Sequence, residues 1–131
     1  MKLSKLFKGS SDFEEKSKEV DCIADLDILK EIAKSDPDYR IRMKAVMRIS
    51  DDPFLNDIVL NDSNRNVKIA ALDNLTNQKY LEGIAKSHPN SHVRIYAIDK
   101  IEDESVLNYI AENDSNRSVK DAALKKIKKI M

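Results

Sequence analysis

The chain has 131 residues, with 23 Lys or Arg and 23 Asp or Glu, so its formal net charge is zero and no strong overall field draws it towards polyanions. Only 2 Gly and 3 Pro occur, too few for the turns of an all-β fold or the glycine-rich loop of a nucleotide-binding α/β fold. No apolar run reaches the roughly 18 residues of a membrane span, one cysteine cannot form an internal disulfide, and the start, MKLSKLFKG, lacks the apolar core of a signal peptide. The sequence therefore predicts an all-α, cytoplasmic protein with a single domain over residues 1–131.

Six apolar columns repeat with a 26-residue period through four copies. Each copy begins with Leu and, three positions later, Ile, and continues with a β-branched residue, an Ala and two further aliphatic residues. The columns are Leu29, Leu55, Leu81 and Leu107; Ile32, Ile58, Ile84 and Ile110; Ile41, Val67, Val93 and Val119; Ala45, Ala71, Ala97 and Ala123; Val46, Leu72, Ile98 and Leu124; and Ile49, Leu75, Ile101 and Ile127. A fixed period of this kind indicates stacked modules that bury one another's apolar faces.

Helical spacing within each copy predicts two helices, a shorter one followed by a longer one. We expect an N-terminal arm over 1–11, a capping half-repeat over 12–24, and repeats over 25–50, 51–76, 77–102 and 103–131. The longer helices are predicted over 38–50, 64–76, 90–101 and 116–131. Because helices of two to three turns are marginal alone, these elements predict a right-handed α-solenoid (α-α superhelix) of four helix pairs plus an N-terminal capping helix, nine helices in all.

Polar residues at the predicted helix starts indicate where the helices are capped. Asp52 is placed to accept hydrogen bonds from the first amides of a shorter helix. Asp62 or Ser63 is the corresponding candidate for the longer helix of the same copy. Pro37 and Pro89 are expected at the early helical position in other copies, since proline suits the first turn.

The motif D-x(4)-V-[RK]-x(2)-A-[VLI], preceded by L-x(2)-I-[AV], resembles HEAT repeats of the armadillo-type α-solenoid family, particularly the short phycobilisome-lyase-like variety, from about residue 12 to residue 129. In HEAT repeats, the aspartate and the following basic residue bridge successive turns. The resemblance therefore implies a structural ladder formed by Asp36, Asp62, Asp114, Arg42, Lys68, Arg94 and Lys120. His88 departs from the aspartate column, and the 26-residue unit is shorter than most. Some HEAT-repeat proteins are di-iron hydroxylases with His-Glu ligands, but no His-Glu dipeptide occurs here.

The remaining candidates for chemistry are two histidines and a cysteine. His88 and His92 are four positions apart, but a metal site needs a third ligand, and Cys22 is far away in the chain. We interpret His88 as the cap of the third longer helix, His92 as a solvated first-turn residue and Cys22 as a quiet, partly buried thiol. The sequence therefore predicts no catalytic residue, no metal and no cofactor, and the protein is interpreted as a non-enzyme.

Charge is divided unevenly between the two kinds of helix. The four predicted longer helices together carry a net charge of +10, so the remaining segments carry −10. In HEAT-like solenoids the second helix of each pair lines the concave side, so the resemblance implies a basic concave surface. Such a stripe suits a phosphate backbone, which makes nucleic-acid binding the alternative function. Because eight of these cations belong to the ladder or the C-terminal tail, protein or peptide binding is favoured.

Positions on the second helices that packing does not require vary between copies, as in a binding face on a uniform scaffold, although any solvated helix face varies in the same way. These candidate contacts are Arg40, Lys44, Met47, Arg48, Asp73, Asn74, His92, Tyr96, Asp99 and Lys100. Among them Met47, Arg48, Tyr96 and Lys100 are favoured, since Met, Arg and aromatic residues are enriched at interfaces. We expect a binding or scaffolding module that is a monomer or end-to-end dimer without stable membrane association. Whether residues 1–11 are ordered or contact lipid stays open.

The alanine column predicts close contact between helices. Ala71→Leu or Ala97→Leu is expected to overpack this contact and to lower the free energy of unfolding by about 1–3 kcal/mol. Chemical denaturation followed by circular dichroism measures the change, and a variant as stable as the parent would contradict the predicted contact.

Overall fold

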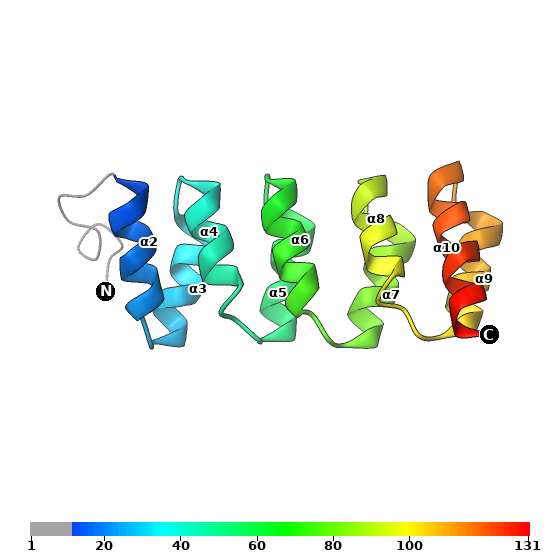
Figure 1. Ribbon diagram of the computed structural model, residues 1–131, viewed down its shortest axis with the longest axis horizontal. Helices are drawn as coiled ribbons and strands as arrows, with labels where there is room; N and C mark the ends of the chain where they lie inside the picture. The colour runs from blue at the N-terminus through cyan, green and yellow to red at the C-terminus, as the bar shows by residue number, and fades with distance from the viewer. Residues whose placement is uncertain (1–11) are drawn as a thin grey trace. The chain divides into compact units, whose positions relative to one another are not determined.

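The computed structural model describes residues 12–131, which form nine α-helices and no strand (Figure 1). The predicted all-α fold is therefore confirmed for this part of the chain, while the predicted N-terminal arm, 1–11, lies outside the described residues. No helix among them is long and apolar enough to cross a membrane. The helices are α2 (Phe13–Cys22), α3 (Leu26–Ser35), α4 (Tyr39–Val46), α5 (Asp52–Asn61), α6 (Arg65–Asn74), α7 (Gln78–Ser87), α8 (Ser91–Ile98), α9 (Glu104–Asn113) and α10 (Arg117–Ile130).

The chain divides into two compact units, Met1–Asn74 and Leu75–Met131, which we call the N-terminal and C-terminal units. In the N-terminal unit α3 pairs with α4 and α5 with α6, and α4 packs against both α2 and α6. In the C-terminal unit α7 pairs with α8 and α9 with α10, and α8 packs against α10. Each unit is thus built from helix pairs whose second helices lie against one another.

The six apolar columns form the core. All their members are at most 9% exposed except Leu124, which is 48% exposed. Its counterpart one copy earlier, Ile98, is 1% exposed and lies where α8 packs against α10. Leu124 instead lines an open groove with Ala111 and Lys120. The same column position is therefore core in one pair and surface in the last one.

The helix caps lie at other residues than predicted. Asp51, not Asp52, caps α5, with its carboxylate accepting from the amide of Phe54. The cap of α6 is neither Asp62 nor Ser63, because Asn64 Oδ1 accepts from the amides two and three positions further on. The Asp62 carboxylate accepts from the Asn64 amide at 2.8 Å instead. Asp62 thus forms an Asx turn in the loop before the cap. The helix α6 therefore begins at Arg65, one residue later than predicted.

The prolines and the helix lengths also differ from the prediction. Pro37 and Pro89 precede the caps Asp38 and Asn90, so they lie in the loops and not in the first helical turn. The first helices all have 10 residues, whereas the second helices have 8, 10, 8 and 14. The second helix is therefore not the longer one in the first three pairs. In α4 the reason is a tight turn, in which the Arg48 amide donates to the carbonyl of Ala45.

The contrast between Ile98 and Leu124 predicts different costs for one kind of truncation. Ile98→Ala removes a buried side chain and is expected to lower the free energy of unfolding by about 2–5 kcal/mol. Leu124→Ala, at the equivalent position on α10, is expected to cost less than about 1 kcal/mol because half of this side chain is already in water. Urea denaturation measures the free energy of unfolding of both variants. Equal decreases for Ile98→Ala and Leu124→Ala would contradict the prediction that the burial of the side chain sets the cost.

Candidate functional site

Two arginines join successive helix pairs within the units. Arg42 reaches Asp62 through Nε and Nη2, at 3.0 and 3.2 Å from the carboxylate oxygens. Arg94 reaches Asp114 in the same way, at 3.0 and 3.1 Å. Each arginine also donates from Nη1 to a carbonyl of the preceding loop, at 2.8 Å and 2.7 Å. These bidentate pairs, with side chains only 11% and 5% exposed, tie a loop to the next helix pair.

The rest of the ladder column is less uniform. Asp36 accepts from Lys16 at 3.5 Å, a contact that the sequence interpretation missed although Lys16 stands one repeat before Arg42. Lys68, one repeat after Arg42, lies on α6 of the N-terminal unit. Lys120 lines the open groove beside Leu124.

His88 replaces the aspartate of the loop through its ring nitrogen. It is 2% exposed, and its Nδ1 accepts from the Asn90 amide at 3.1 Å. Asp36 and Asp114 make the equivalent turn, since their Oδ1 atoms accept from amides two positions further on at 2.9 and 2.8 Å. The interpretation of His88 as the helix cap was wrong, because Asn90 caps α8.

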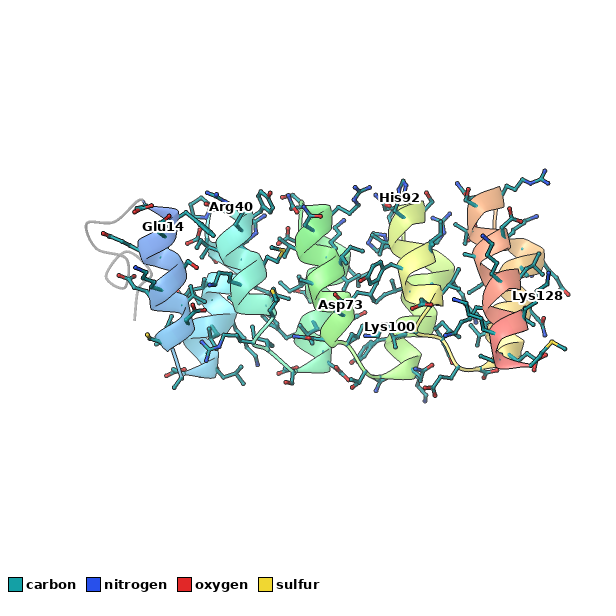
Figure 2. All side chains as sticks on the ribbon, in the orientation of Figure 1. Glu14, Arg40, Asp73, His92, Lys100 and Lys128 are labelled. Atoms are coloured by element: carbon teal, nitrogen blue, oxygen red, sulfur yellow. The ribbon has the colours of Figure 1, made fainter. Side chains whose placement is uncertain are left out.

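The other candidates for chemistry are separated. His92 is exposed in the first turn of α8 (Figure 2). Cys22 is exposed, which corrects the prediction of a partly buried thiol. Cys22 stands one repeat before Arg48, and Arg48 is exposed as well. No group of three His, Cys, Asp or Glu side chains that could hold a metal ion lies within residues 12–131.

Two basic candidate contacts, Lys44 on α4 and Arg48 in the turn after it, bind to α2. Lys44 Nζ lies 2.5 Å from Ser17 Oγ and 3.1 Å from an Asp21 carboxylate oxygen. The Arg48 guanidinium donates to the carbonyl of Val20 at 2.6 Å. Both side chains therefore hold α2 against α4, and their charges are already engaged within the N-terminal unit.

Arg40 is engaged by its own helix cap and by an aromatic ring. It donates through Nε and Nη2 to the two carboxylate oxygens of Asp38, at 3.1 and 2.8 Å. Its guanidinium lies 4.1 Å from the ring centroid of Phe13. The hydrogen bond from Arg40 lowers the pKa of Asp38, and the same bond raises the pKa of Arg40. The Asp38 carboxylate therefore stays ionised to a lower pH than an ordinary aspartate.

A second set of contacts comes from residues that stand 26 positions apart, each in the second helix of a pair or in the turn after it. We call these residues the carbonyl anchor column. Its members are Arg48, Asn74, Lys100 and Lys126. Asn74 Nδ2 lies 3.0–3.2 Å from three carbonyls at the end of α4. Lys100 Nζ donates to the Leu75 carbonyl at 2.7 Å, and Lys126 Nζ to the Asp99 carbonyl at 2.6 Å. Carbonyls at helix ends lack intrahelical partners, so these donors satisfy them while joining neighbouring segments.

The anchor column changes the interpretation of three candidate contacts. Arg48, Asn74 and Lys100 are predicted contacts of a partner, and in the structure their side chains donate hydrogen bonds to backbone carbonyls of neighbouring segments. Lys126 was not singled out, although it stands one repeat after Lys100 and follows the same spacing. The sequence alone showed that the position is polar in each copy and did not show the backbone carbonyls it reaches.

A shallow groove of about 520 Å³ lies between α4 and α6 in the N-terminal unit, and we call it the methionine groove. Its lining is apolar, with amide and carboxylate groups around it: Met43, Met47, Asn66, Ile69, Ala70, Asp73 and Asn74. Met47 is 61% exposed, and Asp73 lies near the C-terminal end of α6 (Figure 2). Met47, Asp73 and Asn74 were predicted as contacts. Met43 and Ile69 were missed, because they lie outside the strip of second-helix positions from which the candidate contacts were taken.

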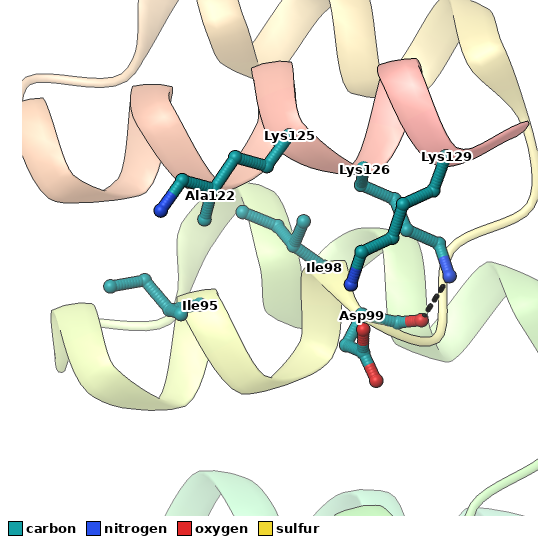
Figure 3. A pocket seen from close by; sticks show the side chains of 7 residues that line it. All are labelled: Ile95, Ile98, Asp99, Ala122, Lys125, Lys126 and Lys129. Atoms are coloured by element: carbon teal, nitrogen blue, oxygen red, sulfur yellow. Dashed lines mark hydrogen bonds between the residues drawn. The ribbon is translucent and has the colours of Figure 1, made fainter. Parts of the chain in front are cut away.

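The equivalent groove of the C-terminal unit lies between α8 and α10 and has a volume of about 170 Å³ (Figure 3). We call it the lysine groove, and its lining residues are Ile95, Ile98, Asp99, Ala122, Lys125, Lys126 and Lys129. Most of them stand two repeats after members of the methionine groove. Of the predicted contacts only Asp99 lies here, while Tyr96 is exposed on α8.

The favoured cluster of predicted contacts divides between the two units. Met47 and Arg48 belong to the N-terminal unit, and Tyr96 and Lys100 belong to the C-terminal unit. Within the N-terminal unit Met47 lines the methionine groove, while Arg48 bonds to α2. The candidate surfaces are therefore best described groove by groove.

Comparisons of the chain with protein-family models, with curated proteins and with solved structures found no match. The assignment of a function therefore rests on the residues and their geometry.

The ladder predicts a large difference between two aspartates of the N-terminal unit. Asp62→Ala leaves the mostly buried guanidinium of Arg42 without its carboxylate and is expected to lower the free energy of unfolding by about 3 kcal/mol. Asp57→Ala is the control, because Asp57 pairs with Lys34 at 3.0 Å with both side chains about half exposed, and it is expected to cost less than about 1 kcal/mol. Chemical denaturation distinguishes them, and similar losses would refute a stabilising ladder.

Proposed function

We propose that this chain is a non-enzymatic binding or scaffolding module of HEAT-like type, which engages a protein or peptide through the surface of its second helices. The proposal includes a right-handed α-solenoid of four 26-residue helix pairs. It is supported by the apolar columns, of which all but one member are buried, and by arginine–aspartate pairs at the positions that the HEAT resemblance implies.

The methionine groove is the single observation that carries the binding function. Two methionines and an isoleucine line it, and Met47 keeps 61% of its surface in water. Exposed apolar groups gathered in a hollow are typical of interaction sites, and methionine adapts to apolar side chains of different shape. Asn66 and Asp73 beside them supply polar groups that can orient a bound chain.

The groove is held in shape by the contacts of its walls. Lys44 and Arg48 bind α4 to α2 on one side, and the Asn74 amide binds the end of α4 on the other side. A wall fixed on both sides loses little conformational entropy when a partner binds. The mechanism is therefore presentation of a preformed apolar surface.

The alternative, nucleic-acid binding by a basic stripe, finds less support in the N-terminal unit. Arg40, Arg42 and Lys44 all lie within ion-pair distance of aspartates. Paired cations release few counterions when they meet a phosphate backbone, so they add little to the affinity for nucleic acid. These pairs favour a protein or peptide as the partner of this unit.

Selection of peptides on the immobilised full chain tests the proposed function. Peptides enriched from a displayed random library are measured by fluorescence anisotropy against the parent chain and against Met47→Glu. We expect at least a tenfold loss of affinity, about 1.4 kcal/mol, because the variant places a charge in the apolar groove.

Leu60→Glu is the matched control, since Leu60 is 48% exposed on α5 of the same unit. It is expected to leave the affinity within about twofold. Equal losses for the two variants, or no enrichment above an unrelated helical protein, would overturn the proposed function.

A further inference from the structure

The lysine groove places three ammonium groups around an apolar floor. Lys125 and Lys129 extend from α10 towards α8 on the two sides of Ile98 (Figure 3). Lys126, between them in sequence, is fixed by its 2.6 Å bond to the carbonyl of Asp99. The floor consists of Ile95, Ile98 and Ala122. The groove thus combines two positively charged arms with a small apolar surface.

Two of the lysines of this groove, Lys125 and Lys129, form no ion pair within residues 12–131. The helix α10 contains six Lys or Arg and one Asp, and four of the lysines lie in its last six positions. Among residues 12–131, no carboxylate lies within 4.0 Å of Lys125, Lys128 or Lys129. Like charges four positions apart on a helix destabilise it, and the helix dipole offsets this only within the last turn. A bound anionic group would relieve the repulsion.

We propose that the lysine groove binds an acidic segment of a protein partner, with carboxylates at Lys125 and Lys129 and a small apolar side chain on the floor between them. This inference rests on the proposed function and names the chemistry of one of its partners. The charge of the groove selects carboxylates, and the apolar floor selects the residue between them.

Two features favour an acidic peptide over a nucleic acid. The lining contains no aromatic side chain on which a base could stack, and such stacking is a main source of affinity for single strands. Asp99 adds a carboxylate to the groove, which would repel a continuous phosphate backbone. A peptide can place its carboxylates away from Asp99 and still bury an apolar side chain.

The two equivalent grooves differ in charge, which separates their ligands. Met47 and Asp73 of the methionine groove correspond to Asp99 and Lys125 of the lysine groove, two repeats later. The first groove therefore presents an apolar surface beside an acid, and the second presents ammonium groups. An acidic segment suits only the second groove.

Fluorescence anisotropy with the full chain tests the inference. The probes are a labelled nine-residue peptide of three Glu-Glu-Leu repeats, its Lys-Lys-Leu counterpart and a single-stranded oligonucleotide of 12 nucleotides. We expect the acidic peptide to bind at least tenfold more tightly than the other two. The double variant Lys125→Glu/Lys129→Glu is expected to weaken this binding at least tenfold, with the helical content unchanged by circular dichroism.

Lys79→Glu/Lys86→Glu is the matched control, because both residues are exposed on α7 of the same unit and the net charge changes by the same amount. It is expected to change the affinity less than threefold. Equal losses in the two double variants would overturn the inference, and so would tighter binding of the oligonucleotide that depends on Lys125 and Lys129.

Met47→Glu separates this inference from the proposed function. Binding of the acidic peptide is expected to survive this change. If library peptides bind at Met47 while the acidic peptide fails to bind, only the present inference falls. If the acidic peptide binds at the lysines while no library peptide depends on Met47, the methionine groove loses its assigned role and the lysine groove keeps its own.

Discussion

Burial of short helices against one another is the constraint on which the rest of this structure depends. Eight of the nine helices within residues 12–131 have ten residues or fewer, a length at which an isolated helix is marginal in water. The paired helices gain their stability from the apolar columns, which are buried between them, and α2 gains it from packing on α4, where Val20 is buried. Positions such as Ala45 and Ala97 must therefore stay small and buried, and the same requirement returns in every repeat.

Polar side chains set how neighbouring helices lie once the columns have brought them together. Arg42 and Arg94 link one loop to the aspartate of the next, and the carbonyl anchor column fills the open ends of preceding segments. Apolar contacts are not directional, whereas a bidentate arginine–carboxylate pair fixes both distance and angle. The grooves between second helices owe their shape to these directional contacts.

This division of roles leaves the groove positions free to vary. The apolar columns keep their residue types from copy to copy, and Arg42 and Arg94 make the same pair with an aspartate, whereas the residues that line the grooves differ. Met47 in one groove and Asp99 in the other occupy the same place in the repeat and present opposite chemistry. Such an arrangement lets one scaffold offer an apolar site and a charged site, as the two proposals require.

The regular spacing of the apolar columns by itself determined the helical class and the core, because burial of periodic apolar residues is a property of the pattern. It did not determine the caps, since Asp51 and Asp52 are equally good cap residues and only the loop path selects between them. Nor did it show that Arg48 and Lys100 serve packing. From the sequence, a long polar side chain at such a position is expected to be exposed to solvent. Only the tertiary structure brings a backbone carbonyl of the preceding repeat within hydrogen-bonding distance of it.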